Sequence, residues 1–375
     1  MSVFKNHSVI PENSKASYSE YDIIDFICTF PSRKMLANTI RLSYTLRVLQ
    51  GNTNLADEDI MWSSKVGGHN IIEGITTETQ LQGQLESVHD YPRLIQMTAG
   101  ATLDINDFMN ASKSCELRSP DDQYSRVQLR GEKLTDRITG SLVNLDNSVS
   151  IKPLFCLNRA SSSDGDVGVS YARVGNVRVS LQLSRMLDAF YGGNVASGIT
   201  SYSISNPRLE FVSIPDDNKV NALQFRVSNS IKQVVNSSLC NLGLKAPVVA
   251  NACAVSFILQ EHQSQAAYDN TACEQLPNVS RLDFTWNNAT NQGITYTIRD
   301  NVELTSRYLQ ALQTSGHNCS SLPLLSANKS YGIGTSFNDE FIDLSKTMLN
   351  IQITSEVNSS NPYSAIFFFA GVVNL

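Results

Sequence analysis

The sequence is poor in charge for its length and contains no block of basic residues. Charged residues make up 17% of the 375-residue chain, where about a quarter is usual, and the net charge is −6. A tail that neutralises nucleic acid needs many Lys and Arg residues, because each phosphate contact requires a cation. The first twenty residues hold only Lys5 and Lys15. We therefore expect neither a basic genome-binding tail nor sequence-specific nucleic-acid binding.

Closely spaced cysteine pairs and long apolar runs are also missing. The seven cysteines are scattered, and no Cys-x-x-Cys pair occurs. This pattern favours reduced thiols in the cytosol or nucleus over a disulfide framework or a zinc site. No stretch of about 18 apolar residues exists to span a membrane, and the segment 1–20 lacks the apolar core of a signal peptide. We expect no transmembrane segment and no structural metal.

The motifs of common enzymes are absent as well. The five histidines form no His-x-x-x-His or His-Glu-x-x-His motif, and no Gly-x-Ser-x-Gly motif occurs. His69 and His89 are candidates for a general base, but no partner residue is indicated for either. The glycine-rich stretches Gly165–Gly168 and Gly332–Gly334 lack the spacing of phosphate-binding loops, so we interpret both as turns. We predict that the protein is not an enzyme, with no catalytic residue and no cofactor.

Two acidic stretches, Asp57–Asp59 and Asp339–Glu340, are the candidates for a calcium site. Calcium takes roughly six to eight oxygen ligands, and each stretch supplies only two or three carboxylates. We interpret both as solvated loops and assign no metal ligand.

Alternation with a period of two residues is the strongest feature that is present. In Thr39–Val48 apolar side chains occupy every second position, and Thr, Arg and Ser occupy the positions between them. The same alternation recurs in Val177–Leu183, Leu282–Trp286 and Leu349–Ile353. Successive side chains of a strand point to opposite faces, so each run predicts a strand with one buried face.

Apolar and aromatic residues near the end of the chain predict a covered strand. Ile366–Val373 is almost entirely apolar, which is typical of a central strand covered on both faces. We expect Phe367–Phe369 to lie in the core, and likewise Trp62 and Trp286, because large aromatic side chains dominate burial.

Evidence for helices is sparse. Asn301–Gln313 is the best candidate, since Asp300 and Glu303 form a plausible capping box and apolar residues follow along one stripe. A second candidate covers Glu86–Met97, although Pro92 interrupts it, and a third covers Asp104–Ser112.

The two halves of the chain resemble each other weakly. Gly74–Thr79 and Gly293–Ile298 share a Gly-Ile-Thr start, and each precedes a helical candidate. The run Val177–Leu183 likewise matches Leu349–Ile353, and one further strand follows in each half. Many short strands separated by Gly, Asn and Pro predict an all-β protein of sandwiches or barrels, with two repeated units that meet near Pro215.

Four segments carry a more specific pattern, in order along the chain. They are Gly67–Ile75 with the following Tyr91–Met97, Ile151–Asn158 with the following Tyr171–Leu183, Ser201–Ile204, and Tyr331–Ile353. Together they resemble the double jelly-roll major capsid proteins of tailless icosahedral DNA viruses. That group includes coat proteins of membrane-containing phages, adenovirus hexons, and the capsid proteins of virophages, polinton-like viruses and large DNA viruses.

The resemblance implies an all-β fold with a few short loop helices and two consecutive eight-stranded jelly-roll barrels. We expect an N-terminal arm at 1–20, a first jelly roll at 21–215 and a second at 216–375. It also implies a homotrimer that forms a pseudo-hexagonal capsomer in a virion shell. The expected partners are neighbouring capsomers, penton or minor capsid proteins and, in some members, an internal membrane. Assembly would take place in the host cytoplasm or nucleus.

Two alternatives remain open from the residues. The first is a scaffolding or minor capsid protein built on the same fold. The second is a carbohydrate-binding β-sandwich protein, which would need exposed aromatic and polar groups at one rim. An enzyme ranks third, because no cluster of titratable residues is indicated.

Overall fold

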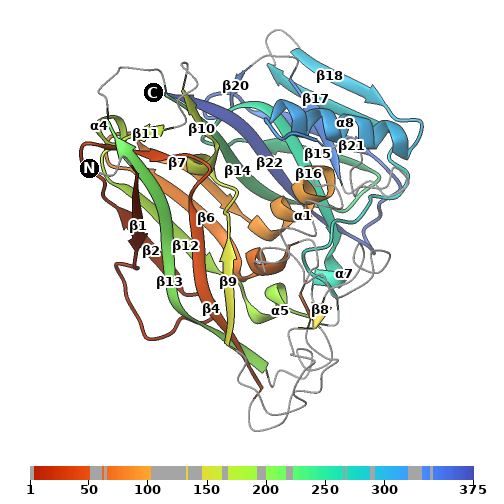
Figure 1. Cartoon of the computed structure of the whole chain (residues 1–375). Coiled ribbons are helices and arrows are strands. Elements are labelled where there is room, and N and C mark those ends of the chain that lie inside the picture. Colours follow the sequence, from red (N-terminus) through yellow and green to blue (C-terminus); the bar gives the residue numbers. More distant parts are fainter. Residues whose placement is uncertain are drawn as a thin grey trace.

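The computed structural model describes residues 4–50, 61–62, 66–102, 132–133, 146–162, 168–191, 200–216, 223–263, 265–266, 268–287, 292–319, 332–337 and 341–375. Figure 1 shows two β-rich halves side by side, the first coloured red to green and the second green to blue. No helix in these ranges is both long enough and apolar enough to cross a membrane.

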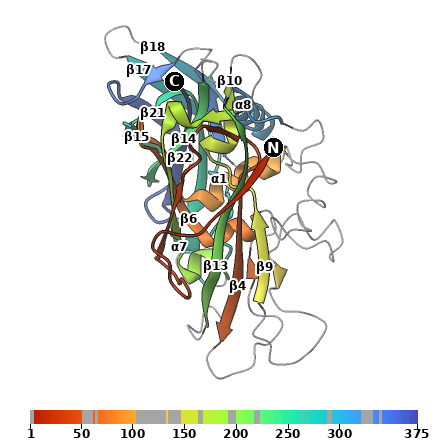
Figure 2. The same cartoon turned by 60° about the vertical axis from the view of Figure 1, so that its left-hand side comes forward.

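The first half of the chain is a sandwich of two sheets. Their hydrogen-bonding orders are β1-β13-β4-β9 and β2-β12-β6-β7. The strands are β1 (Lys5–Val9), β2 (Ile23–Cys28), β4 (Arg41–Gln50), β6 (Ile72–Thr79), β7 (Gly83–His89), β9 (Asp146–Ile151), β12 (Val177–Leu183) and β13 (Thr200–Pro215). Two short strands, β3 (Arg33–Leu36) and β11 (Gly168–Ser170), extend the first sheet. Figure 2 shows β13, β4 and β9 running side by side along the molecule.

The second half is another two-sheet sandwich. Its sheets have the orders β14-β22-β16-β19 and β15-β21-β17-β18. The strands are β14 (Leu223–Val235), β15 (Leu239–Leu244), β16 (Val249–Leu259), β17 (Arg281–Asn287), β18 (Gln292–Thr297), β19 (Ile333–Ser336), β21 (Leu349–Thr354) and β22 (Tyr363–Asn374). A two-residue strand, β20 (Ile342–Asp343), pairs with β16 beside β19.

The two sandwiches have the same topology. When the strands just named are counted from one to eight in each half, both sandwiches have one sheet in the order 1-8-3-6 and the other in the order 2-7-4-5. This is the strand order of a jelly roll, a barrel of two four-stranded sheets packed face to face. The predicted fold of two consecutive eight-stranded jelly rolls is therefore confirmed.

One sheet continues from the first barrel into the second. The fifth strand of the first barrel, β7, lies parallel to the first strand of the second, β14, with Ser87 opposite Asn229. The strand β10 (Ala160–Ser162) of the first half also pairs with β14. The result is a ten-stranded sheet shared by both barrels.

Within the described ranges, the two long helices occupy equivalent places, each following the fifth strand of its barrel. They are α1 (Tyr91–Thr102) and α8 (Asn301–Thr314), and the Tyr308 hydroxyl of α8 donates to the Met97 carbonyl of α1 at 2.7 Å. The shorter helices are η1 (Gly67–Ile71), η2 (Cys156–Arg159), α4 (Tyr171–Val174), α5 (Met186–Ala189) and α7 (Gln260–Gln263).

Of the three helix predictions, one is confirmed, one is wrong at its start and one lies outside the described residues. Asp300 caps α8 by accepting a hydrogen bond from the Glu303 N–H at 2.9 Å. The candidate Glu86–Met97 begins too early, because residues 86–89 belong to β7 and Asp90 takes a positive φ of 53° before α1 starts. Pro92 then lies in the first turn of the helix, where its missing N–H costs no hydrogen bond. The candidate Asp104–Ser112 lies outside the described residues.

The alternating runs are strands, as predicted, but the repeat was aligned incorrectly in one place. Val177–Leu183 and Leu349–Ile353 both lie in the seventh strand of their barrels. Gly74–Thr79 lies in the fourth strand of the first barrel, whereas Gly293–Ile298 covers the fifth strand of the second. Both segments belong to the hairpin that precedes the long helix of their barrel. Their similar sequences therefore matched two strands that are not equivalent but lie one position apart in the strand order.

The chain between the barrels is short, and the first residues pack on the first barrel. β13 ends at Pro215 and β14 begins at Leu223. Within the segment expected to be an arm, β1 pairs with β13, and Tyr18 is 1% exposed and forms an isolated bridge with Ile204. The carboxylate of Asp216, just after β13, accepts from the Ser170 hydroxyl and lies 3.9 Å from the Lys34 ammonium.

Candidate functional site: the junction between the two barrels

Side chains of β14 complete the hydrogen bonding where the two barrels meet. The Asn229 Oδ1 accepts from the Ser87 N–H at 3.2 Å. The Ser230 hydroxyl accepts from the His89 N–H at 2.6 Å and donates to the His89 carbonyl at 2.9 Å. These contacts satisfy backbone groups of β7 that would otherwise form an open sheet edge.

A buried carboxylate, Glu86, joins the barrels beneath this strand pair. Its Oε1 accepts from the Cys156 N–H at 2.6 Å, and its Oε2 accepts from the Ser228 N–H of β14 at 3.3 Å. Glu86 is 1% exposed. Burial raises the pKa of the Glu86 carboxyl, while these hydrogen bonds and the Arg159 guanidinium oppose the rise.

Arg159 extends the same network to the end of α8. Its Nη1 donates to the Ser228 hydroxyl at 3.2 Å, and its Nη2 donates to the Ser315 carbonyl at 2.6 Å. Arg226 packs directly on Gly316, where an added Cβ would lie 1.1 Å from the Arg226 Nη1. A loop of the first barrel is thereby fixed to both β14 and the helix terminus of the second.

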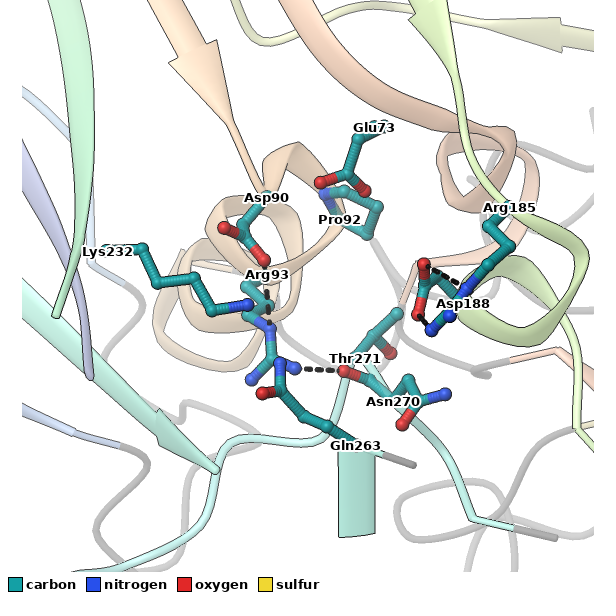
Figure 3. Close-up of a pocket in the computed structure, with 10 residues that line it drawn as sticks. All are labelled: Glu73, Asp90, Pro92, Arg93, Arg185, Asp188, Lys232, Gln263, Asn270 and Thr271. Carbon is teal, nitrogen blue, oxygen red and sulfur yellow. Dashed lines mark hydrogen bonds and ion pairs between the residues drawn. The ribbon is translucent and has the colours of Figure 1, made fainter. Parts of the chain in front are cut away.

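A polar cavity of about 180 Å³ lies at the junction (Figure 3). Both barrels contribute to its wall, and nearly all of the lining side chains are polar or charged. The first barrel supplies Glu73, Asp90, Pro92, Arg93, Arg185 and Asp188, and the second supplies Lys232, Gln263, Asn270 and Thr271.

Most charged groups of the cavity already have partners. The Arg93 Nε lies 3.7 Å from the Asp90 carboxylate, and its Nη atoms donate to the carbonyls of Asn270 and Ala272. Arg185 donates twice to Asp188, at 2.9 and 3.1 Å. Arg93 thus holds the loop between β16 and β17 against the first barrel.

Glu73 differs from these groups, since its carboxylate has no hydrogen bond within the described part of the chain. Burial, together with the nearby carboxylates of Asp90 and Asp188, raises the pKa of Glu73 to about 8. The side chain therefore keeps its proton at neutral pH. Across the described ranges, no three His, Cys, Asp or Glu side chains are grouped so as to hold a metal ion.

The two histidines considered as bases lie in different surroundings. His69 is buried, its Nδ1 lies 3.0 Å from the Tyr91 hydroxyl, and that hydroxyl also accepts from the Leu154 N–H at 2.9 Å. Burial lowers the pKa of His69 to about 3, so the ring is neutral and serves packing. His89 lies at the junction, where its main chain makes the contacts to Ser230.

Of the glycine-rich and acidic stretches, Gly332–Gly334 and Gly168 lie within the described residues. The interpretation of Gly332–Gly334 as a turn is wrong, because Ile333 and Gly334 belong to β19, which pairs with β16. An added Cβ at Gly334 would lie 2.7 Å from the Ala311 Cβ, so glycine lets α8 pack closely on this strand. Gly168 begins β11, whereas Gly165, Asp57–Asp59 and Asp339–Glu340 lie outside the described residues.

The predicted core aromatics are buried where the structure describes them. Phe367–Phe369 are at most 4% exposed within β22, which lies between β14 and β16, and Trp286 is 7% exposed. The side chain of Trp62 is outside the described set. None of the six described cysteines forms a disulfide.

The junction residues themselves were missed from sequence. The helix prediction for Glu86–Met97 is wrong at Glu86, which lies in β7, and no sequence pattern predicts a role for Arg159, Asn229 or Ser230. The sequence gives no clear signal for Glu86, because Leu85 and Val88 are the only apolar side chains in Gly83–His89 and a glutamate in such a run is ordinarily solvated.

Comparisons with known proteins agree with this architecture. No family model matches the sequence, and no curated protein matches it. Among solved structures, the Faustovirus major capsid protein superposes with a TM-score of 0.62 at 7% identity, over 99% of this chain and 90% of that one. A chain of the PBCV-1 virus capsid gives 0.57 at 10% identity, over 99% and 94%. The mavirus major capsid protein gives 0.53 at 11% identity, over 98% and 86%.

At identities this low, structural similarity is evidence for the fold alone. The strand order of both barrels agrees with that fold. The resemblance first suggested by the four sequence segments is confirmed at that level. The chain has the double jelly-roll fold of viral major capsid proteins.

Proposed function

We propose that the protein is a major capsid protein, a structural subunit that assembles as a trimer into pseudo-hexagonal capsomers of an icosahedral shell. The observation that carries this proposal is the pair of barrels with identical strand order, joined by one continuous sheet. The likeness to capsid proteins over nearly the whole chain supports it. Its role is structural rather than catalytic.

Geometry explains why such a subunit suits a shell. Two similar barrels held side by side make one third of a six-part ring, so three copies give a block with a nearly hexagonal outline. Blocks of that outline tile a flat lattice. A fixed junction between the barrels is needed for this, and the contacts of Glu86, Arg159 and Arg93 provide it.

The remaining expectations belong to the same proposal. We keep the division into an arm at 1–20, a first barrel at 21–215 and a second barrel at 216–375 as part of the proposal. Pro215 ends the last strand of the first barrel, which supports the second boundary, whereas the arm contains β1, a strand of the first barrel. The partners would be neighbouring capsomers and penton or minor capsid proteins, and the site of action would be the virion.

The mass of the purified protein in solution tests the proposal. Light scattering should give a stable species near three times 41.3 kDa, and negative-stain images should show particles with a hexagonal outline. A protein that stays monomeric at all concentrations would contradict it, and would favour a single-copy interaction protein on the same fold.

A further inference from the structure

We propose that a second copy of this chain docks its first strand, β1, beside β18, and so repeats between copies the junction that β14 and β7 make within one copy. This inference rests on the proposed function, because it requires copies arranged in a ring. It names the two strands that form the contact.

The equivalence of the two barrels leads to this pair of strands. Within the chain, the fifth strand of the first barrel (β7) lies beside the first strand of the second barrel (β14). In a ring of similar barrels, the next junction joins the fifth strand of the second barrel to the first strand of the following first barrel. Those strands are β18 and β1 of the neighbouring copy.

Both strands have an open edge in the single chain. β18 hydrogen-bonds to β17, and β1 hydrogen-bonds to β13, and neither has a second strand partner among the described residues. Open edges expose unpaired N–H and C=O groups, which another strand can satisfy. In the first barrel, the edge that corresponds to β18 is occupied by β14.

β18 and β1 are more exposed than their equivalents β7 and β14, as expected if β18 and β1 make their contact only when a second copy is bound. Every residue of β18 and of β1 is at least partly exposed. By contrast, Leu85, Glu86 and Val88 are buried in β7, and six of the thirteen residues of β14 are buried. The two strands that meet inside the chain are covered, and their two counterparts are open to solvent.

The side chains of β1 can supply the same kind of contact as those of β14. At the internal junction, the short polar side chains Asn229 and Ser230 bind the backbone of β7. β1 offers Asn6 and Ser8, which are exposed and whose side chains make no hydrogen bond in the described part of the chain. Both can reach the backbone of a neighbouring strand.

Site-specific photo-crosslinking of the assembled protein tests the contact. Thr297, an exposed residue at the end of β18, is replaced by p-benzoylphenylalanine, and labelled and unlabelled copies are mixed so that crosslinks between copies can be recognised. The matched control carries the same group at Leu239, which is 53% exposed on β15, the opposite edge of the same sheet. We expect crosslinks from position 297 to residues 4–10 of another copy, and none from position 239 to that segment.

The possible results separate the two proposals. Trimers whose position 297 crosslinks elsewhere, or only within its own chain, would overturn the β1–β18 contact and leave the capsid subunit standing. A protein that never forms trimers would overturn both.

A double substitution measures the polar contribution of β1. Asn6→Ala with Ser8→Ala should raise the dissociation constant of the trimer about tenfold for each β1–β18 contact that dissociation breaks, because it removes one to two hydrogen bonds at each contact. Asn241→Ala on β15 is the control and should leave it unchanged, and circular dichroism checks that each variant folds. An unchanged dissociation constant for the double variant would overturn the role of β1.

Discussion

At the scale of single residues, the junction is held by charged side chains that are buried but not isolated. Glu86 accepts from backbone N–H groups of both barrels, and Arg159 donates to a hydroxyl and a carbonyl of the second. A buried charge that loses its partners is costly, whereas one fully hydrogen-bonded is tolerated. The two residues therefore fix the relative position of the barrels more than they raise stability.

Removing the Glu86 carboxylate should destabilise the protein strongly. Glu86→Ala leaves the N–H groups of Cys156 and Ser228 without an acceptor and Arg159 without its counter-charge, so we expect a loss of about 3–5 kcal/mol in the free energy of unfolding. Urea denaturation measures it. The exposed Glu12 provides the control, since Glu12→Ala should change the free energy by less than about 0.5 kcal/mol. A loss below about 1 kcal/mol for Glu86→Ala would contradict the role of this side chain.

Glu73 should make the stability depend on pH. Its pKa in the folded protein is about 8, above the ordinary value of 4.5, so the folded state binds this proton more tightly than the unfolded state. The stabilisation is complete below about pH 4.5 and is lost as the pH rises to about 8. Between about pH 5 and about pH 9 the wild type should therefore lose on the order of 2 kcal/mol of its free energy of unfolding, after allowing for partial solvent access. Glu73→Gln should abolish this loss.

Urea denaturation at the two pH values checks this expectation. The control Glu12→Gln should keep the pH dependence of the wild type. Parallel pH dependences for the wild type and Glu73→Gln would show that the Glu73 carboxyl titrates normally.

At the scale of elements, local patterns predicted the strands that alternate regularly. Val177–Leu183 and Leu349–Ile353 could be recognised because a strand with one buried face leaves its period in the sequence. β19 could not, since Gly334 within it and Gly332 just before it look like a turn, and the pairing with β16 and the packing of α8 on Gly334 are not visible in the sequence. The start of α1 was missed for a similar reason: the left-handed Asp90 that separates it from β7 has no unique sequence signal.

The contact between α8 and β19 should tolerate no side chain at Gly334. Gly334→Val places a branched group against the Ala311 Cβ and the Tyr308 backbone, so we expect a loss of about 1–3 kcal/mol or more from overpacking. Thermal unfolding followed by circular dichroism measures the change. Gly243→Ala is the control: its new Cβ would meet mainly the flexible Met348 side chain, which can move aside. Equal melting temperatures for Gly334→Val and wild type would contradict close packing here.

At the scale of the whole molecule, the two-barrel plan could be predicted and the junction could not. The repeat of strand patterns shows in each half separately. The junction pairs Ser87 with Asn229, which are far apart in the sequence, and its groups are ordinary Asn, Ser, Glu and Arg side chains. Such residues are usually solvated, so only the folded arrangement distinguishes them.

The continuous sheet predicts that both barrels unfold together. A domain that shares backbone pairing, buried charges and packed helices with its neighbour cannot open without exposing those groups in both. Hydrogen exchange should therefore give the same opening free energy for the central amides of β12 in the first barrel and β21 in the second. Glu86→Ala should lower both values equally, although Glu86 belongs to the first barrel. If β21 kept the wild-type value in that variant, the barrels would be independent folding units, and the shared sheet alone would not hold the block rigid.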